Sequence, residues 1–254
     1  MLGQAIWWSS IALESLLLFR GFRGRLASRY PAFYFYISFV LFQDVVCFAV
    51  ARWTHSSDAY TSAYWTAEFL CVLVSCGIVF EIYRVGLAAF PGTARMARNL
   101  MGLVFVVVLI KLIVNIVKDP QWWTEASARG VEGTLRAIQG VAIVALIALF
   151  IFYSVPFGRN LRGILMGYGL FVCWSVCCLT LAPPTGRLHD ILGFLYSALY
   201  PLFLVLWLVP LWSYQANAAP KQAIQLEQDY QRVAIATQRR LHEARSYVAR
   251  AVGS

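Results

Sequence analysis

The sequence predicts an all-α integral membrane protein, a polytopic bundle of seven transmembrane helices followed by a cytoplasmic C-terminal helix. The first observation behind this prediction is composition, because 60% of the 254 residues are hydrophobic and 13% are charged. Soluble domains carry about a quarter charged residues, and one of this size could not bury so much apolar surface. The second observation is a series of seven long apolar segments. The third is an unequal distribution of Lys and Arg between the segments that join them.

The apolar segments have the length expected of transmembrane helices, since about 20 residues are needed to cross roughly 30 Å of hydrocarbon. Short turns rich in Arg, Pro, Gly and Ser separate them. No ten-residue pattern of alternating polar and apolar residues recurs, so membrane-spanning strands are not expected. The predicted helices cover residues 4–20, 31–52, 61–83, 99–117, 134–154, 161–182 and 190–213.

The distribution of Lys and Arg predicts how these helices are oriented. The segments around the turns after the first, third and fifth helices, counted with the adjoining helix ends and the C-terminal tail, contain fifteen Lys and Arg residues. The segments around the turns after the second, fourth and sixth helices, counted in the same way, contain five. Because cytoplasmic loops are enriched in Lys and Arg, we expect the N-terminus outside and the C-terminus in the cytoplasm. The short loops favour a multi-pass protein of a cytoplasmic (inner) membrane.

The chain divides into a transmembrane domain, residues 1–216, and a cytoplasmic amphipathic or docking helix, residues 217–254. After Pro220 the sequence becomes polar and has high helix propensity, with no Pro or Gly for about thirty residues. Small and apolar residues recur there at spacings of three and four, which is typical of an amphipathic helix. Two interpretations remain open. The helix lies on the inner membrane surface, or residues 220–252 bind a second copy of the chain or another protein.

Two further patterns concern packing within the transmembrane domain. The turn LLLFRGFRGRL after the first helix is similar to VPFGRNLRGIL after the fifth. One interpretation is a 3+1+3 repeat, in which helices one to three are related to helices five to seven and the fourth stands alone; such repeats place transporter sites at the repeat interface. The other is that Arg-Gly turns are similar by chance. Gly163 and Gly167 are four residues apart on the sixth helix, a spacing that allows close helix packing.

Ionisable residues inside predicted helices are the strongest functional signal, because burying a charge in a membrane is costly. On the third helix Tyr64 and Glu68 share one face, and on the fourth Lys111 and Asn115 share another. We therefore expect a polar cavity that opens outward between the first five helices. Its predicted lining is Glu14, Gln43, Asp44, Tyr64, Glu68, Lys111, Asn115 and Gln139.

The charges of this predicted cavity do not balance, since Glu14, Asp44 and Glu68 face Lys111 alone. In a low dielectric at least one of the three carboxylates must hold a proton or bind a cation. The leading hypothesis is therefore a channel or secondary transporter, coupled to protons. A purely structural alternative pairs Lys111 with one acid and leaves the others protonated between helices. A third alternative is a signalling or scaffold subunit that couples an external ligand to a partner through the C-terminal helix.

Several other classes of function are not expected. GxSxG, HExxH, Walker and GxGxxG motifs are absent, so we predict no enzymatic activity. The alternative is a membrane enzyme that acts on lipid through His189 and Asp190, although their spacing matches no motif. No histidine lies within a predicted transmembrane helix and the seventh helix lacks lysine, so neither haem nor retinal is expected and no cofactor is predicted. The net charge of +9 follows the membrane topology and does not indicate nucleic acid. A weak zinc or pH-sensing hypothesis places His55 and Asp58 beside His189 and Asp190, but solvated loop histidines are the favoured interpretation of these residues.

Overall fold

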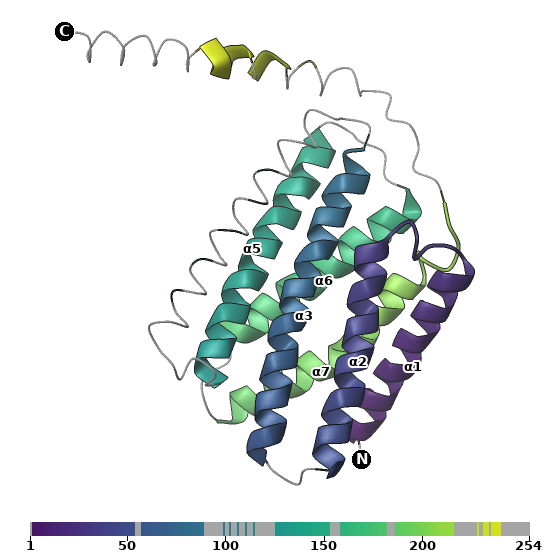
Figure 1. Cartoon of the computed structure of the whole chain (residues 1–254), viewed down its shortest axis with the longest axis vertical. Coiled ribbons are helices and arrows are strands. Elements are labelled where there is room, and N and C mark those ends of the chain that lie inside the picture. The colour runs from purple at the N-terminus through teal and green to yellow at the C-terminus, as the bar shows by residue number, and fades with distance from the viewer. Residues whose placement is uncertain are drawn as a thin grey trace, which may run out of the picture.

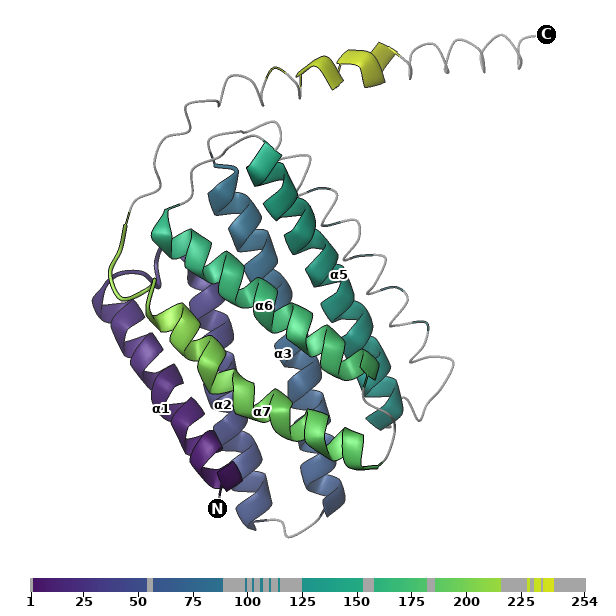
Figure 2. The same cartoon turned by 180° about the vertical axis from the view of Figure 1, so that it is seen from behind.

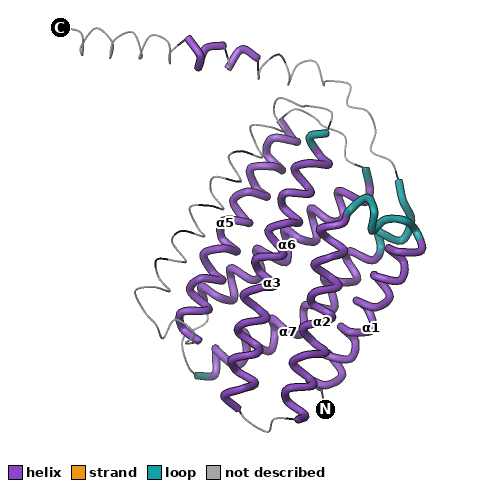
Figure 3. The backbone as a smooth tube through the Cα atoms, in the orientation of Figure 1, coloured by secondary structure: helices purple, strands orange, loops and turns teal. Residues whose placement is uncertain are grey.

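The computed structural model describes residues 2–53, 57–88, 125–152, 158–181 and 186–215, with single or few positions in 99–114 and 228–239. Within these ranges every regular element is an α-helix and no strand occurs, which confirms the all-α fold class (Figure 3). The helices are α1 (Leu2–Arg23), α2 (Pro31–Trp53), α3 (Ser57–Gly86), α5 (Glu125–Phe152), α6 (Arg159–Leu181) and α7 (Arg187–Leu208). The predicted helices 99–117 and 220–252 lie mostly outside the described residues.

Four of the helices are long and apolar enough to cross a membrane, which indicates a membrane protein. They are Pro31–Trp53, Ala63–Gly86, Arg159–Leu181 and Arg187–Leu208. Large apolar side chains also point away from the bundle: Phe42 is 63% exposed and Ile151 is 74% exposed. Exposed apolar surface on this scale needs lipid or another apolar partner to cover it.

The described helices close into a ring (Figures 1 and 2). Each of α1, α2, α3, α5, α6 and α7 packs against the next in this order, and α7 returns to pack against α1. α1, α2, α3 and α5 stand side by side, while α6 and α7 cross one face obliquely. Figure 2 shows that α1 and α7 converge at the end where α1 finishes and diverge toward the end that carries the N-terminus.

The turn between α1 and α2 follows from local chemistry. After α1 the chain reverses through Arg25, whose φ is 55°, and the Leu26 amide donates to the Gly21 carbonyl at 2.9 Å. Such a bond across a left-handed residue is the usual way to satisfy the last carbonyls of a helix. Pro31 then opens α2 at the first helical position, where its missing N–H costs nothing. A Cβ on Gly21 would collide with the ring of Tyr34, so glycine allows the two helices to approach closely.

Close packing at the two α6 glycines is confirmed. A Cβ on Gly163 would collide with Pro210, and one on Gly167 would lie 2.5 Å from the Trp207 indole nitrogen. Small residues on α6 thus let α7 and the turn after it lie directly against the helix. Trp207 is completely buried and its ring contacts Phe33 and Phe171 at centroid distances of 5.4 and 6.1 Å. These aromatic rings fill the centre of the bundle.

Arginines gather at the end of the bundle opposite the N-terminus. Arg20 and Arg23 lie in the last turn of α1, Arg84 in the last turn of α3, and Arg159 and Arg162 in the first turn of α6. The chain that follows α7 is held at this same end. The bundle therefore has two different ends, one where these arginines gather and one where α1 and α7 diverge.

Candidate functional site

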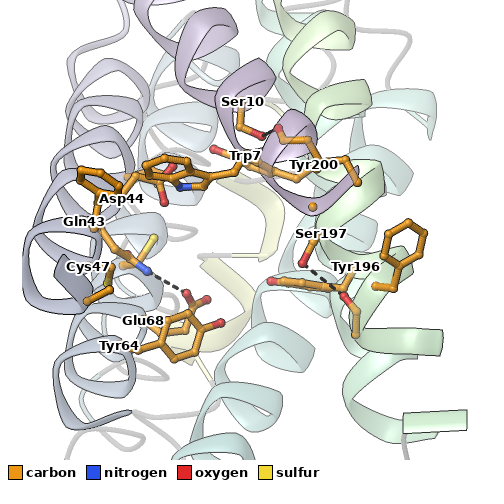
Figure 4. A pocket seen from close by; sticks show the side chains of 18 of the residues that line it. Trp7, Ser10, Gln43, Asp44, Cys47, Tyr64, Glu68, Tyr196, Ser197 and Tyr200 are labelled. Atoms are coloured by element: carbon orange, nitrogen blue, oxygen red, sulfur yellow. Dashed lines mark hydrogen bonds between the residues drawn. The ribbon is translucent and has the colours of Figure 1, made fainter. Parts of the chain in front are cut away.

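A cavity of about 680 Å³ lies between α1, α2, α3 and α7 (Figure 4). Gly3, Ala51, Tyr60 and Gly193 line it near the ends of these helices that surround the N-terminus. Its innermost wall includes Arg136 from α5 and Phe171 from α6. The volume falls in the range of about 300–1,000 Å³ that is typical of small-molecule sites. The cavity arises because α7 diverges from α1 and leaves the space between them unfilled.

Aromatic side chains form much of the cavity wall. Trp7 of α1 stacks on Phe48 of α2 with a centroid distance of 5.2 Å and an interplanar angle of 26°. Tyr64 on α3 stacks on Tyr60, one turn earlier, at 6.4 Å. On the opposite side α7 contributes an aromatic wall in which Tyr196 and Tyr200 lie 6.5 and 6.0 Å from the Phe171 ring. The space between these walls is therefore bounded by aromatic rings from five helices, α1, α2, α3, α6 and α7.

Two acidic side chains, Asp44 and Glu68, and one basic side chain, Arg136, line the cavity. The Gln43 amide donates to Glu68 Oε2 at 3.2 Å, which ties α2 to α3 (Figure 4). Asp44 follows Gln43 on α2, and its carboxylate lies next to the indole of Trp7. None of the ion pairs found between described residues includes Asp44. Its carboxylate is consequently available to a cation that enters the cavity.

Arg136 is the most deeply buried charge of the site, with 1% of its side chain exposed. Its Nη2 lies 3.5 Å from Glu68 Oε1, and its Nε lies 3.5 Å from Glu132 Oε1 one turn earlier on α5. The guanidinium also lies 4.9 Å from the centroid of the Phe171 ring. Two carboxylates thus share one guanidinium, so this cluster carries one negative charge in excess when all three groups are ionised.

Three buried polar atoms of the lining have no hydrogen-bond partner among the described residues. They are the amide oxygen of Gln43, an acceptor, and Nε and Nη1 of Arg136, both donors; of these, Nε is in ion-pair distance of Glu132. Gln43 is 7% exposed. Buried polar groups nearly always find a partner in protein or ordered water, so the cavity offers both an acceptor and a donor to whatever fills it. This complementarity distinguishes it from a packing defect, which would be lined by apolar atoms.

Glu14, a predicted lining residue, lies one layer behind the cavity. It is completely buried, and its Oε1 accepts a hydrogen bond of 2.9 Å from the Tyr200 hydroxyl. Tyr200 lines the cavity and Glu14 does not. Glu14 therefore reaches the cavity only through the tyrosine that it orients. Of the other predicted residues, Gln43, Asp44, Tyr64 and Glu68 do line it.

Gln139 occupies a different position from the one expected for it. Its amide nitrogen donates to the Ser75 hydroxyl at 3.0 Å and to the Val72 carbonyl at 3.3 Å, while its oxygen accepts from the Tyr168 hydroxyl at 2.9 Å. It is 3% exposed and does not line the cavity. Helix α5 turns this face toward α3 and α6, so Gln139 joins three helices and is satisfied without a ligand.

The remaining predicted residues are not assembled by the described part of the chain. Lys111, Asn115 and His55 lie outside the described residues, as does the side chain of Asp58. His189 and Asp190 are in the first turn of α7, where Asp190 is exposed. Among the side chains that the structure describes, no group of three or more His, Cys, Asp or Glu residues could hold a metal ion.

The roles of Glu132 and Arg136 were not predicted from the sequence. The predicted helix begins at residue 134, whereas α5 begins nine residues earlier at Glu125, and both side chains are buried in the bundle. A signal was present, because Glu132 and Arg136 are spaced i, i+4 and Gln139 follows three residues later, which places all three on one helical face. The aromatic partners Tyr196 and Tyr200 carried no comparable signal, since aromatic residues are frequent throughout the chain.

No protein-family model, curated protein or solved structure matches this chain significantly.

Proposed function

We propose that this chain is a proton-coupled secondary transporter of a cytoplasmic membrane, and that the cavity is its substrate site in an outward-open state. In this proposal the chain spans the membrane seven times, with the N-terminus outside and the C-terminus in the cytoplasm. The observation that carries the proposal is a cavity that is open at one end of the bundle and ends at buried, charged Arg136 and Glu68.

The position of the arginines supports an outward-facing mouth. Arginines of α1, α3 and α6 gather at the end opposite the cavity mouth. The positive-inside rule assigns an arginine-rich end to the cytoplasm. The mouth, which lies near the N-terminus and Gly193, then faces the outside.

The closed inner half of the bundle favours a transporter over an open channel. Tyr36 and Phe171 of the cavity wall pack against Phe33, Tyr168 and Trp207, and all five side chains are buried. A conducting channel needs a continuous polar path, whereas alternating access needs one closed side at a time. Helices α6 and α7 supply most of this closure, so their movement relative to α1 and α2 would open the inner side.

The Glu68 cluster supports coupling to protons. Glu68 and Glu132 share Arg136, so the cluster has one negative charge in excess, and a low dielectric favours its neutralisation by one cation. A proton and a cationic substrate can both supply that charge, which makes their binding competitive. Competition of this kind is the simplest basis for exchanging a substrate against protons.

Flux in liposomes tests the proposal. The full chain would be reconstituted, and internal pH would be followed with a trapped dye under an imposed membrane potential, first without solute and then with small amines, carboxylates and sugars. We expect at least one solute to move protons faster than in empty liposomes. Glu68→Gln should lower that rate at least tenfold, because it removes the ionisable group at the base of the cavity.

Asp190→Asn is the matched control, since it also converts a carboxylate into an amide but lies on an exposed turn outside the lining. Its flux should stay within twofold of the wild type. The transport proposal is overturned if no solute produces flux above that of empty liposomes, or if Glu68→Gln and Asp190→Asn behave alike.

A second candidate function is a signalling or scaffold subunit that acts through the C-terminal segment. It is favoured by the contacts that hold the chain after α7. Arg20 of α1 donates to the Trp212 carbonyl at 2.6 Å and lies 4.2 Å from its ring. Asn160 of α6 donates to the carbonyls of Pro210 and Ser213 at 2.8 Å, and accepts from the Gln215 amide at 2.6 Å. A shift of α1 or α6 would therefore be transmitted to residues 212–215, from which the tail departs.

Deleting residues 220–254 tests this second function. A signalling or scaffold subunit should lose association with a partner or a second copy while its transmembrane domain keeps its thermal stability. Unchanged association, measured by cross-linking in native membranes, would argue against it.

A further inference from the structure

We propose that the cavity binds a small organic amine, with its ammonium group between Asp44, Gln43 and Glu68 and its apolar body against the aromatic walls. This inference names the substrate class of the proposed transporter and so rests on the proposed function for its biological meaning. Binding itself can be tested without transport.

The charge of the lining favours a cation. Asp44 and Glu68 are the two carboxylates that line the cavity, and they lie on neighbouring helices joined by the Gln43–Glu68 hydrogen bond. Arg136 is the cationic side chain of the described lining, and it is already shared between Glu68 and Glu132. An entering anion would add to this excess of negative charge, whereas an entering cation would neutralise it.

The aromatic walls favour an organic cation over a metal ion or a proton alone. Trp7 and Phe48 form one wall, and Tyr196 and Tyr200 of α7 belong to another. Figure 4 shows Tyr196 across the cavity from Gln43 and Asp44. A cation within about 6 Å of an aromatic centroid is attracted by the ring, most strongly by tryptophan. Trp7 lies beside Asp44, so the ring type that attracts cations most strongly and a carboxylate lie next to each other. The remaining ring surface suits an apolar body.

The unpartnered Gln43 oxygen favours an amine that carries N–H groups. Gln43 is buried, with 7% of its surface exposed, and its amide oxygen has no partner among the described residues. Its amide nitrogen is already committed to Glu68, so the free atom is the acceptor. A protonated primary amine has three donors and can serve Gln43, Asp44 and Glu68 together. A quaternary ammonium ion has none and would leave Gln43 unsatisfied.

Competition binding tests this inference with defined probes. The purified full-length chain in detergent would be dialysed against radiolabelled 2-phenylethylamine, and 2-phenylethanol, 3-phenylpropionate and tetramethylammonium would be added as competitors. These probes share a similar size or charge but differ in whether they carry an ammonium with N–H donors. We expect unlabelled 2-phenylethylamine to compete at least tenfold better than each of the other three.

Matched substitutions locate the site. Asp44→Asn should weaken binding of 2-phenylethylamine at least tenfold, while Asp190→Asn should leave it unchanged. Trp7→Leu should weaken binding as well, while Trp8→Leu should not, because Trp8 is 57% exposed and is not part of the lining. Thermal unfolding of each variant checks that it remains folded. A folded Asp44→Asn protein that binds like the wild type overturns the amine site.

The outcomes separate this inference from the proposed function. If 2-phenylethanol or 3-phenylpropionate competes as well as the amine, the amine inference is overturned, and transport stands or falls on the flux measurement. If the amine binds selectively but no solute moves protons in liposomes, the amine site is supported and the transport proposal fails.

Discussion

Glu81, near the end of α3, accepts a hydrogen bond of 3.0 Å from the backbone amide of Phe33 in the first turn of α2. The other carboxylate oxygen accepts from the Ala32 amide at the same distance. Arg84, three residues later on the same helix, lies 3.7 Å away and is 67% exposed. Glu81 is thus primarily the cap of another helix, where it satisfies two amides that have no partner within α2.

Replacing Glu81 should destabilise the bundle. Glu81→Ala leaves both amides buried without an acceptor, and we expect a loss of about 1–3 kcal/mol in the free energy of unfolding. Thermal or denaturant unfolding of the detergent-solubilised protein measures it. Arg84→Ala is the control and should change stability little, because a largely exposed ion pair contributes little. Equal losses for the two variants would contradict the capping role.

Removing Arg136 should destabilise the protein more strongly. Arg136→Ala leaves Glu68 and Glu132 together in a buried site without their shared cation, and breaking a buried pair in this way costs about 3–5 kcal/mol. Unfolding measurements on single and double variants give the value. Adding Glu132→Gln to Arg136→Ala should recover part of the loss, because it removes one of the stranded charges. A double variant less stable than Arg136→Ala would refute the shared-cation arrangement.

Gln139 should matter for stability and not for ligand binding. Gln139→Leu removes hydrogen bonds to Ser75 and Tyr168 and leaves their polar atoms buried, so a loss of about 1–3 kcal/mol is expected. The affinity for 2-phenylethylamine, measured by equilibrium dialysis on the folded variant, should remain within twofold of the wild type. A tenfold loss of affinity at unchanged stability would place Gln139 in the site, as sequence analysis expected.

Two glycines in helices should respond to alanine in opposite directions. Gly167→Ala brings a methyl group against Trp207 and should lower stability by about 1–3 kcal/mol, the usual effect of overpacking. Gly133→Ala in α5 has no atom within 4 Å of the new Cβ, so stability should rise by up to about 1 kcal/mol through helix propensity. Melting temperatures of the two variants decide this. Destabilisation by Gly133→Ala would show that the space beside α5 is filled.

The proposed orientation can be checked by chemical labelling. In a variant without the six native cysteines, Arg187→Cys would place a thiol in the first turn of α7, and Arg84→Cys would place one in the last turn of α3. With the N-terminus outside, a membrane-impermeant maleimide added to intact spheroplasts should label position 187 and spare position 84. The reverse pattern would invert the topology and turn the cavity mouth toward the cytoplasm.

The sequence by itself determined the all-α class and the approximate helices of the described part. Long apolar runs force helix formation in lipid because every backbone group must be paired within its own segment, and this rule needs no knowledge of neighbours. The same reasoning brought Gln43, Asp44, Tyr64 and Glu68 to one place, because helical phase tells which residues share a face. It also identified Gly163 and Gly167 as a packing surface.

Only the tertiary structure decided which residues meet across helices. Helical phase places Glu81, Gln139 and Arg136 on particular faces of their helices, but it does not tell whether their partner is a backbone amide, a hydroxyl, a carboxylate or an open cavity. Those partners depend on helix tilt and rotation, which arise from packing between segments far apart in the chain. The divergence of α1 and α7 is such a property. It leaves the space that Trp7, Asp44 and Tyr200 surround, and no local pattern in the sequence encodes it.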